Sequence, residues 1–142
     1  MAGAAVPVAE LSEAELRAWG YALGEAAEPG TILALEGDLG AGKTTLAQAI
    51  ARGWGVSVEV TSPTYAIVHA YAAPRGPLHH FDLYRLERPE QLAPIGWDEM
   101  LGANGLVVVE WPERAGKWLP HEVQRIQLAH LPTDPSHRRV TW

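Results

Sequence analysis

The sequence predicts an α/β fold of three layers, in which helices cover both faces of a mostly parallel central sheet. The first reason is that residues 31–36 read as a short buried strand and residues 45–52 as a helix, joined by a glycine-rich turn. The second is that residues 106–109 form a continuous apolar run, Leu-Val-Val-Val, typical of a strand buried on both faces of a parallel sheet. Strands that alternate with helices along a chain build this kind of sheet.

A first helix is predicted before the glycine-rich turn. Ser12 and Glu15 have the S-x-x-E spacing of a capping box, and Leu16, Trp19 and Leu23 follow at helical spacing. The residues before this helix show no clear pattern, so we leave residues 1–10 without an assignment.

The rest of the chain adds a hairpin and two final strands. Two β-rich runs, residues 64–71 and 78–84, flank a Pro- and Gly-containing loop and predict a β-hairpin insertion after the helix of the glycine-rich turn. Residues 91–101 form a weaker helical stretch that Pro94 and Gly96 interrupt. Residues 124–131 and 138–142 read as strands, expected to form a C-terminal antiparallel pair.

Composition limits the classes of function. A chain of 142 residues with 47% hydrophobic residues is expected to form one domain, residues 1–142. Its net charge of −6 argues against broad, sequence-independent contact with nucleic acid. The absence of cysteine excludes disulfides, zinc–thiolate sites and thiol catalysis. Without an apolar run of about 20 residues or a basic leader segment, a soluble, cytoplasmic protein is expected.

The strongest chemical motif is the glycine-rich turn itself. It fits G-x-x-x-x-G-K-[ST], the phosphate-binding P-loop, with the residues Gly37, Asp38, Leu39, Gly40, Ala41, Gly42, Lys43 and Thr44. Glycines allow backbone N–H groups to surround a polyphosphate, the lysine adds a positive charge, and the threonine hydroxyl can ligate Mg²⁺. The turn leads into a helix N-terminus, whose unpaired N–H groups and dipole also favour anions.

A carboxylate follows the buried apolar strand. Glu110 comes directly after residues 106–109, at the end of a central strand where open α/β sheets bind their ligands. There it can hold Mg²⁺, directly or through water, as the acid of P-loop NTPases does. The plain alternative is an exposed carboxylate at a strand end. Trp111, the next residue, either stacks near the nucleotide or packs the loop.

The hairpin supplies a second acidic candidate. His80, Asp82 and Tyr84 alternate onto one face of their strand, and a symmetric hairpin places Asp82 opposite Ile67 and Thr64 opposite Arg85. Asp82 can then orient the attacking water or complete the metal shell, and Thr64 resembles the sensing threonine of GTPase switch loops. Because His79 and His80 point to opposite faces, they are not expected to share a metal site, and packing is the expected role of both.

Four motifs together resemble one family. The first motif is the glycine-rich loop together with Thr45. It is followed, in this order, by Thr-Ser-Pro-Thr-Tyr at 61–65, His-Phe-Asp-Leu-Tyr-Arg-Leu at 80–86 and Val-Glu-Trp-Pro-Glu at 109–113. The chain resembles the TsaE (YjeE) family, the small bacterial P-loop ATPases of tRNA threonylcarbamoyladenosine biosynthesis, from about residue 11 onward.

The resemblance implies ATP and Mg²⁺ as ligands and the TsaB–TsaD complex as partner, with tRNA reached only through that complex. It implies that the loop residues, Thr45 and Trp111 bind the nucleotide, and that Thr44 and Glu110 hold the metal. Lys43, Thr64 and Asp82 are the implied catalytic residues, with Thr64 and Asp82 near the γ-phosphate. Because no arginine of the sequence is an obvious finger acting on its own site, we expect a weak intrinsic hydrolysis that rises when the partner complex orders the hairpin or supplies the missing charge.

Three other functions compete with this reading. A small-molecule kinase has the same loop but needs an acceptor site and an Arg-rich lid, for which the chain leaves little room. A GTPase normally carries N-K-x-D, whereas Asn104, the only asparagine, is followed by Gly105. An ATP-dependent assembly switch, whose hydrolysis is incidental, is not separable from an obligate ATPase by sequence.

Overall fold

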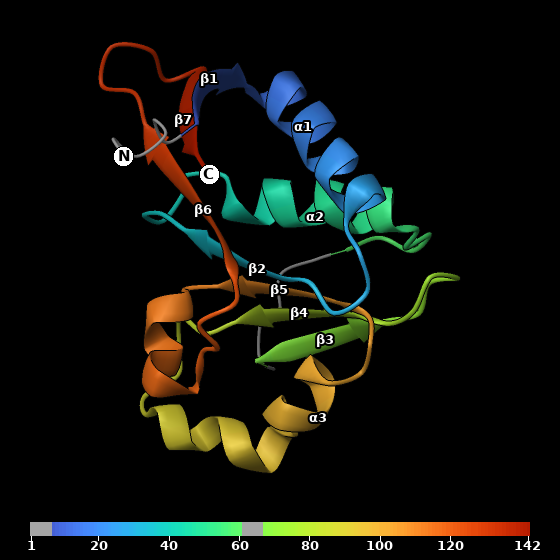
Figure 1. Cartoon of the computed structure of the whole chain (residues 1–142). Coiled ribbons are helices and arrows are strands. Elements are labelled where there is room, and N and C mark those ends of the chain that lie inside the picture. Colours follow the sequence, from blue (N-terminus) through green and yellow to red (C-terminus); the bar gives the residue numbers. More distant parts are fainter. Residues whose placement is uncertain (1–6, 61–66) are drawn as a thin grey trace, which may run out of the picture.

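The computed structural model describes residues 7–60 and 67–142, and its centre is a seven-stranded sheet with the order β1-β7-β6-β2-β5-β4-β3 (Figure 1). The strands are β1 (Val8–Ser12), β2 (Ile32–Glu36), β3 (Val68–Tyr71), β4 (Leu78–Asp82), β5 (Leu106–Glu110), β6 (Gln124–His130) and β7 (His137–Thr141). The α-helices are α1 (Glu13–Ala26), α2 (Lys43–Trp54) and α3 (Trp97–Leu101), and two 3-10 segments are η1 (Pro89–Ile95) and η2 (Pro112–Trp118).

The middle of the sheet is parallel, as the sequence predicts. Strand β2 lies between β5 and β6, and β4 continues the parallel set on the far side of β5. The carboxyl ends of β2, β4 and β5 therefore lie at one edge of the sheet, where a ligand crevice is expected. Antiparallel strands flank this centre, because β3 pairs with β4 and the C-terminal strands β6 and β7 pair with each other.

Strand β1 occupies part of the region left without an assignment. It pairs in antiparallel register with β7 at the sheet edge, where its residues are only partly buried. Such a strand has neither a continuous apolar run nor a regular alternation of apolar and polar residues, so its sequence does not predict a strand. It ends in the predicted capping box, in which Glu15 N donates to Ser12 Oγ (3.2 Å) and Ser12 N donates to Glu15 Oε1 (2.9 Å).

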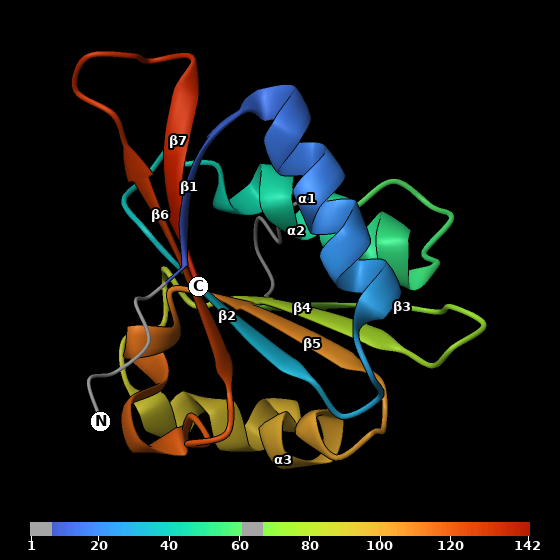
Figure 2. The same cartoon turned by 45° about the horizontal axis from the view of Figure 1, so that its top comes forward.

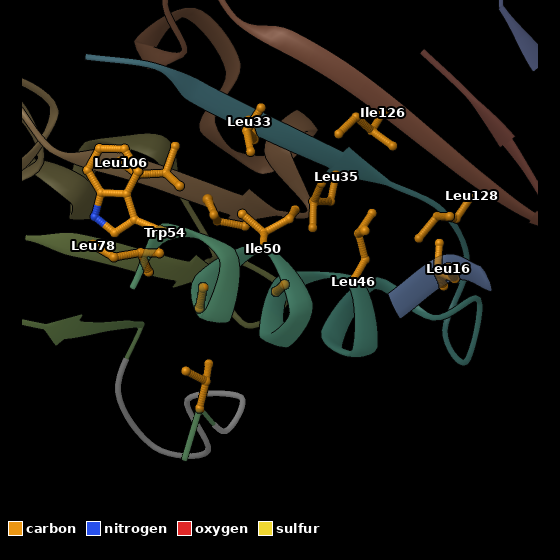
Figure 3. Packing of buried hydrophobic residues seen from close by; sticks show 14 of the residues in the cluster. Leu16, Leu33, Leu35, Leu46, Ile50, Trp54, Leu78, Leu106, Ile126 and Leu128 are labelled. Carbon is orange, nitrogen blue, oxygen red and sulfur yellow. The ribbon is translucent and has the colours of Figure 1, made fainter. Parts of the chain in front are cut away.

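Two hydrophobic cores lie on opposite faces of the sheet. The helical segments that cover these two faces make up the predicted outer layers (Figure 2). Helices α1 and α2 cover one face, where Leu46, Ile50 and Trp54 of α2 pack toward Leu33 and Leu35 of β2 (Figure 3). The segments η1, α3 and η2 cover the other face, packed on side chains that include Phe81 and Trp97. Pro94 lies inside η1, and Gly96, in a left-handed conformation, separates η1 from α3, which accounts for the interrupted helical pattern.

Helices α1 and α2 approach each other closely because glycines lie at their contact. A Cβ atom at Gly24 of α1 would stand 2.0 Å from the Ile50 carbonyl oxygen, and one at Gly53 of α2 would stand 2.0 Å from that of Tyr21. Helix α2 ends at Trp54, with Gly55 as a left-handed C-cap (φ 116°). Within the described residues, no helix is both long enough and apolar enough to cross a bilayer.

Candidate nucleotide-binding site

The glycine-rich loop joins the end of β2 at Glu36 to the start of α2 at Lys43. Gly40 and Gly42 have positive φ values of 76° and 105°, in the left-handed region that side chains disfavour. At Gly37, an added Cβ would lie 2.5 Å from the Leu128 carbonyl oxygen. Gly42 is the N-cap of α2 and has no side chain to satisfy the first N–H groups of the helix. The N-terminal end of α2 is therefore not capped by a side chain of its N-cap residue, and its backbone N–H groups and dipole favour an anion.

Lys43 lies at the bottom of this loop and is only 5% exposed. Its Nζ donates a hydrogen bond to the Gly37 carbonyl oxygen and stands 3.3 Å from the centre of the Trp111 ring. Burial lowers the pKa of Lys43, and the negative charges of Glu110, Glu113, Asp82 and Asp38 partly oppose that shift. The loop thus holds a poorly hydrated positive charge, which an anionic ligand would stabilise.

Thr44 and Glu110 form a pair of oxygen donors next to Lys43. Thr44 Oγ1 donates to Glu110 Oε1 across 3.3 Å, and Glu110 is 2% exposed at the end of β5. A hydroxyl and a carboxylate with a second carboxylate nearby are hard oxygen ligands, the type that Mg²⁺ prefers. Among the residues that the structure describes, no three His, Cys, Asp or Glu side chains gather as a metal site. The donor set therefore fits a magnesium ion that takes its other ligands from phosphate and water.

Asp82 lies beside Glu110, in register with it on the neighbouring strand β4. The hairpin register is the predicted one, because Val68 pairs with Phe81 and Asp82 N donates to the Ile67 carbonyl oxygen (2.9 Å). Burial raises the pKa of Asp82, and the charge of Glu110 adds to this shift. Tyr84 N donates to Asp82 Oδ1 (3.1 Å), which opposes the shift and fixes the carboxyl group. Thr64 and its predicted position opposite Arg85 lie outside the described residues.

Trp111 forms one wall of the site. It adopts a left-handed conformation (φ 58°, ψ 50°) at the start of η2, which turns the chain sharply after β5. Its ring lies over Lys43 Nζ and its centre is 5.0 Å from that of the Tyr84 ring. The sequence left two roles open for this tryptophan, stacking near the nucleotide or packing the loop. In the structure its ring contacts the lysine of the glycine-rich loop and also packs against the Tyr84 ring.

A cavity of ≈ 390 Å³ collects most of the predicted residues. Its lining includes Lys43, Thr44, Thr45, Asp82, Glu110 and Trp111. A second cavity of ≈ 550 Å³ shares Gly40, Gly42 and Thr45 with the first and extends to Glu13 and Arg138. The glycine-rich loop thus separates a polar cavity with two carboxyl groups from a larger one against the start of α1.

The sequence-based expectation for His80 was incomplete. Its side chain is fully buried, as expected for packing, but Nε2 lies 2.6 Å from Glu110 Oε2. His79 lies on the opposite face of β4 and is also buried. The alternation of β4 puts His80 on the face of Asp82, but only the pairing of β4 with β5 brings it to Glu110.

Comparisons with known proteins place the chain in one family. The family model described as threonylcarbamoyl adenosine biosynthesis protein TsaE matches residues 11–140. The chain belongs to the TsaE family. Among proteins named tRNA threonylcarbamoyladenosine biosynthesis protein TsaE, that of Bacillus subtilis is 39% identical over 116 residues, 82% of this chain and 71% of the relative. That of Rickettsia bellii is 34% identical over 131 residues, 92% of this chain and 90% of the relative.

Coverage differs between TsaE relatives. The match to the Nostoc protein, 44% identical, spans 98 residues, 67% of this chain and 60% of the relative. The crystal structure of YdiB from Bacillus subtilis superposes with a TM-score of 0.76 at 31% identity, over 98% of this chain and 86% of that one. The fold shared with this relative therefore extends over nearly the whole chain.

Proposed function

We propose that this TsaE-family chain binds ATP with Mg²⁺ and hydrolyses it as a subunit of the machinery that makes tRNA threonylcarbamoyladenosine, together with TsaB and TsaD. The observation that carries the proposal is the convergence of Lys43, Thr44, Asp82 and Glu110 on one cavity at the carboxyl edge of the sheet. A lysine, a hydroxyl and two carboxyl groups around a glycine-rich loop are the parts that phosphoryl transfer from a nucleoside triphosphate needs.

Each part has a distinct task in this proposal. The loop amides and Lys43 bind the β- and γ-phosphate oxygens, while Thr44 and Glu110 hold the metal. Bound Mg²⁺ neutralises negative charge on the phosphates and lowers the cost of charge that develops during transfer. Asp82 orients the attacking water and accepts its proton, and its raised pKa makes it a better acceptor than an ordinary aspartate.

The adjoining cavity is suited to the nucleoside. It begins where the loop passes Gly40 and Gly42, so a triphosphate in the loop would lead into it. Arg138 lies at its edge, donating to the Pro135 carbonyl oxygen (2.8 Å), and the Glu13 side chain offers an acceptor. Adenine presents an amino group and an aromatic face, which a carboxylate and a guanidinium can contact.

The partner proteins are part of the proposal because, among the described residues, no arginine lines the cavity that holds Lys43 and Glu110. In P-loop NTPases a missing arginine supplied by a partner raises turnover by about 10³- to 10⁵-fold. We expect slow ATP hydrolysis by the chain alone and a marked increase when TsaB and TsaD are added.

The test is a steady-state measurement of ATP turnover with and without the TsaB–TsaD complex, paired with a reconstituted tRNA modification assay. Fast turnover that the partners do not change would overturn the partner requirement. Asp82→Asn should bind ATP but not hydrolyse it. This variant therefore distinguishes a chain whose hydrolysis is required for each round of modification from one whose hydrolysis is incidental. If this variant supports repeated rounds of modification, the chain acts as an ATP-dependent assembly switch and not as an obligate ATPase.

A further inference from the structure

The buried contact between His80 and Glu110 joins the centre of β4 to the metal-binding end of β5. Both side chains are nearly inaccessible, at 1% and 3% exposure, and Nε2 and Oε2 are 2.6 Å apart. His80 itself pairs with Val108, so its ring reaches diagonally across two adjacent parallel strands to the carboxyl group of Glu110. Neither the phosphate nor the proton-transfer steps described above make use of this histidine.

The hydrogen-bonding roles in this contact follow from simple chemistry. An ionised carboxylate can only accept, so His80 Nε2 carries the hydrogen and donates it. His80 Nδ1 is buried without a hydrogen-bond partner among the described residues. The orientation of the ring is therefore fixed by its hydrogen bond to Glu110 and by its buried position on β4. No second polar contact within the described residues fixes it.

The contact divides the two oxygens of Glu110 between two tasks. Oε2 is held by His80, whereas Oε1 faces the hydroxyl of Thr44 at 3.3 Å. A glutamate has one more rotatable bond than the aspartate that holds the metal in many P-loop NTPases, so its carboxylate must be fixed to present one oxygen to a metal. Metal-binding carboxylates are generally held by hydrogen bonds of this kind, and loss of such a bond typically weakens metal affinity about 10- to 100-fold.

We propose that His80 is a positioning residue for the magnesium site: its Nε2–H fixes the carboxylate of Glu110 so that Oε1 is presented together with Thr44 Oγ1. This inference rests on the proposed function, in which Thr44 and Glu110 are the metal ligands. A purely structural histidine would stabilise the fold without affecting metal affinity, and the experiment separates the two roles.

The experiment compares two amide substitutions in the full chain. In His80→Gln the amide nitrogen can reach the place of Nε2, while in His80→Asn it reaches only as far as Nδ1. Mn²⁺ affinity is measured by electron paramagnetic resonance in the presence of ADP, and ADP affinity is measured separately in EDTA. We expect His80→Asn to weaken Mn²⁺ binding about 10- to 100-fold, His80→Gln to retain most of it, and both to bind ADP normally in EDTA.

The matched control is His79→Asn, which removes a buried histidine one residue away on the opposite face of β4. It should leave Mn²⁺ affinity unchanged even if it lowers the melting temperature. Equal Mn²⁺ affinity in His80→Asn and wild type, or an equal loss in the two Asn variants, would overturn the positioning role.

Two further measurements keep the test decisive. If His80→Asn does not fold, His80→Leu takes its place, because leucine fills the buried position without a hydrogen-bond donor. Unchanged Mn²⁺ affinity in His80→Leu overturns the proposal, and a loss that His80→Gln does not share supports it. If wild type binds ADP but shows no dependence on Mn²⁺, the proposed metal site itself is wrong. Unchanged metal binding in the His80 variants with normal metal dependence in wild type refutes only the role of His80.

Discussion

Asp82 on β4 lies in register with Glu110 on β5, so two carboxyl groups share one end of the sheet beside Lys43. Burial is the larger cause of the raised pKa of Asp82, and the charge of Glu110 adds to it, while His80 and Lys43 act in the opposite direction. A charged carboxyl group in such a place costs folding free energy until a cation or substrate compensates it. The arrangement therefore lowers the stability of the ligand-free protein, and a bound cation would relieve this cost.

The first prediction is that Asp82→Asn stabilises the metal-free protein at neutral pH. Between the ordinary pKa of 3.8 and the raised value, the folded state binds more protons than the unfolded state, so stability falls as pH rises through this window. The amide removes that loss and can still accept the bond from Tyr84 N. The melting temperatures of Asp82→Asn and wild type, measured in EDTA, should differ most at pH 7 and converge below pH 3.8. A variant that is less stable than wild type at pH 7 would contradict this prediction.

The second prediction concerns Lys43→Ala. Loss of a charged donor to phosphate should weaken ATP binding about 10- to 150-fold, which corresponds to about 1.5–3 kcal/mol. Because burial lowers the pKa of Lys43, removal of its charge should cost little stability. Lys117→Ala is the matched control, since Lys117 is the only other lysine and is exposed on η2. Titration with a fluorescent ATP analogue, together with a melting curve, checks both statements; equal ATP affinities in the two variants would contradict the phosphate role.

Local sequence patterns were sufficient to predict those features of the fold that depend on residues close together in the chain. The glycine-rich loop, the apolar run of β5 and the capping box at Ser12 each depend on neighbouring residues, and all three are observed. The hairpin register, and with it the position of Asp82 opposite Ile67, followed from the length of a single loop.

Contacts between distant segments could not be predicted. The bond between His80 and Glu110 depends on β4 pairing in parallel with β5, which no pattern within either strand specifies. Strand β1 was missed because an edge strand has one neighbour and a weak burial pattern. The contacts of Arg75 could not be predicted either, since its hydrogen-bond partners lie about 50 residues away at the end of α1.

The third prediction follows from Arg75, which caps α1 from the hairpin loop. Its guanidinium donates to the carbonyl oxygens of Gly24 (3.0 Å), Glu25 (3.1 Å) and Ala27, and lies 4.1 Å from the centre of the Trp54 ring. Helix α1 has no basic residue in its last turn, so this loop residue supplies the positive charge that a helix C-terminus favours.

Arg75→Ala should therefore lower the free energy of unfolding by about 1–3 kcal/mol, measured by urea denaturation. The control is Arg17→Ala, which removes an exposed pair with Glu13 at i,i+4 spacing (3.2 Å) and should cost about 0.5 kcal/mol or less. Equal effects of the two substitutions would show that the cap contributes nothing beyond an ordinary surface charge.

The last prediction concerns the close contact of α1 with α2, the helix that begins at Lys43. Gly24→Ala places a methyl group where the Ile50 carbonyl oxygen now lies 2.0 Å away, and this backbone atom cannot rotate aside. Overpacking of this kind costs about 1–3 kcal/mol or more, which exceeds the gain of roughly 1 kcal/mol in helix propensity. We expect a clear net loss of stability in urea denaturation. Ala22→Ser is the control, since it adds one atom at an exposed position of α1 and should cost about 0.5 kcal/mol.

Gly53→Ala makes the reciprocal test, because its methyl group would meet the Tyr21 carbonyl oxygen at 2.0 Å. Each substitution alone must push the same two helices apart. Once the first substitution has moved the helices apart, the second methyl group clashes less. The double variant should therefore lose less stability than the sum of the losses in the two single variants. Additive losses would mean that the two glycines act independently, each through its own helix, and would contradict the view that they set one interhelical distance.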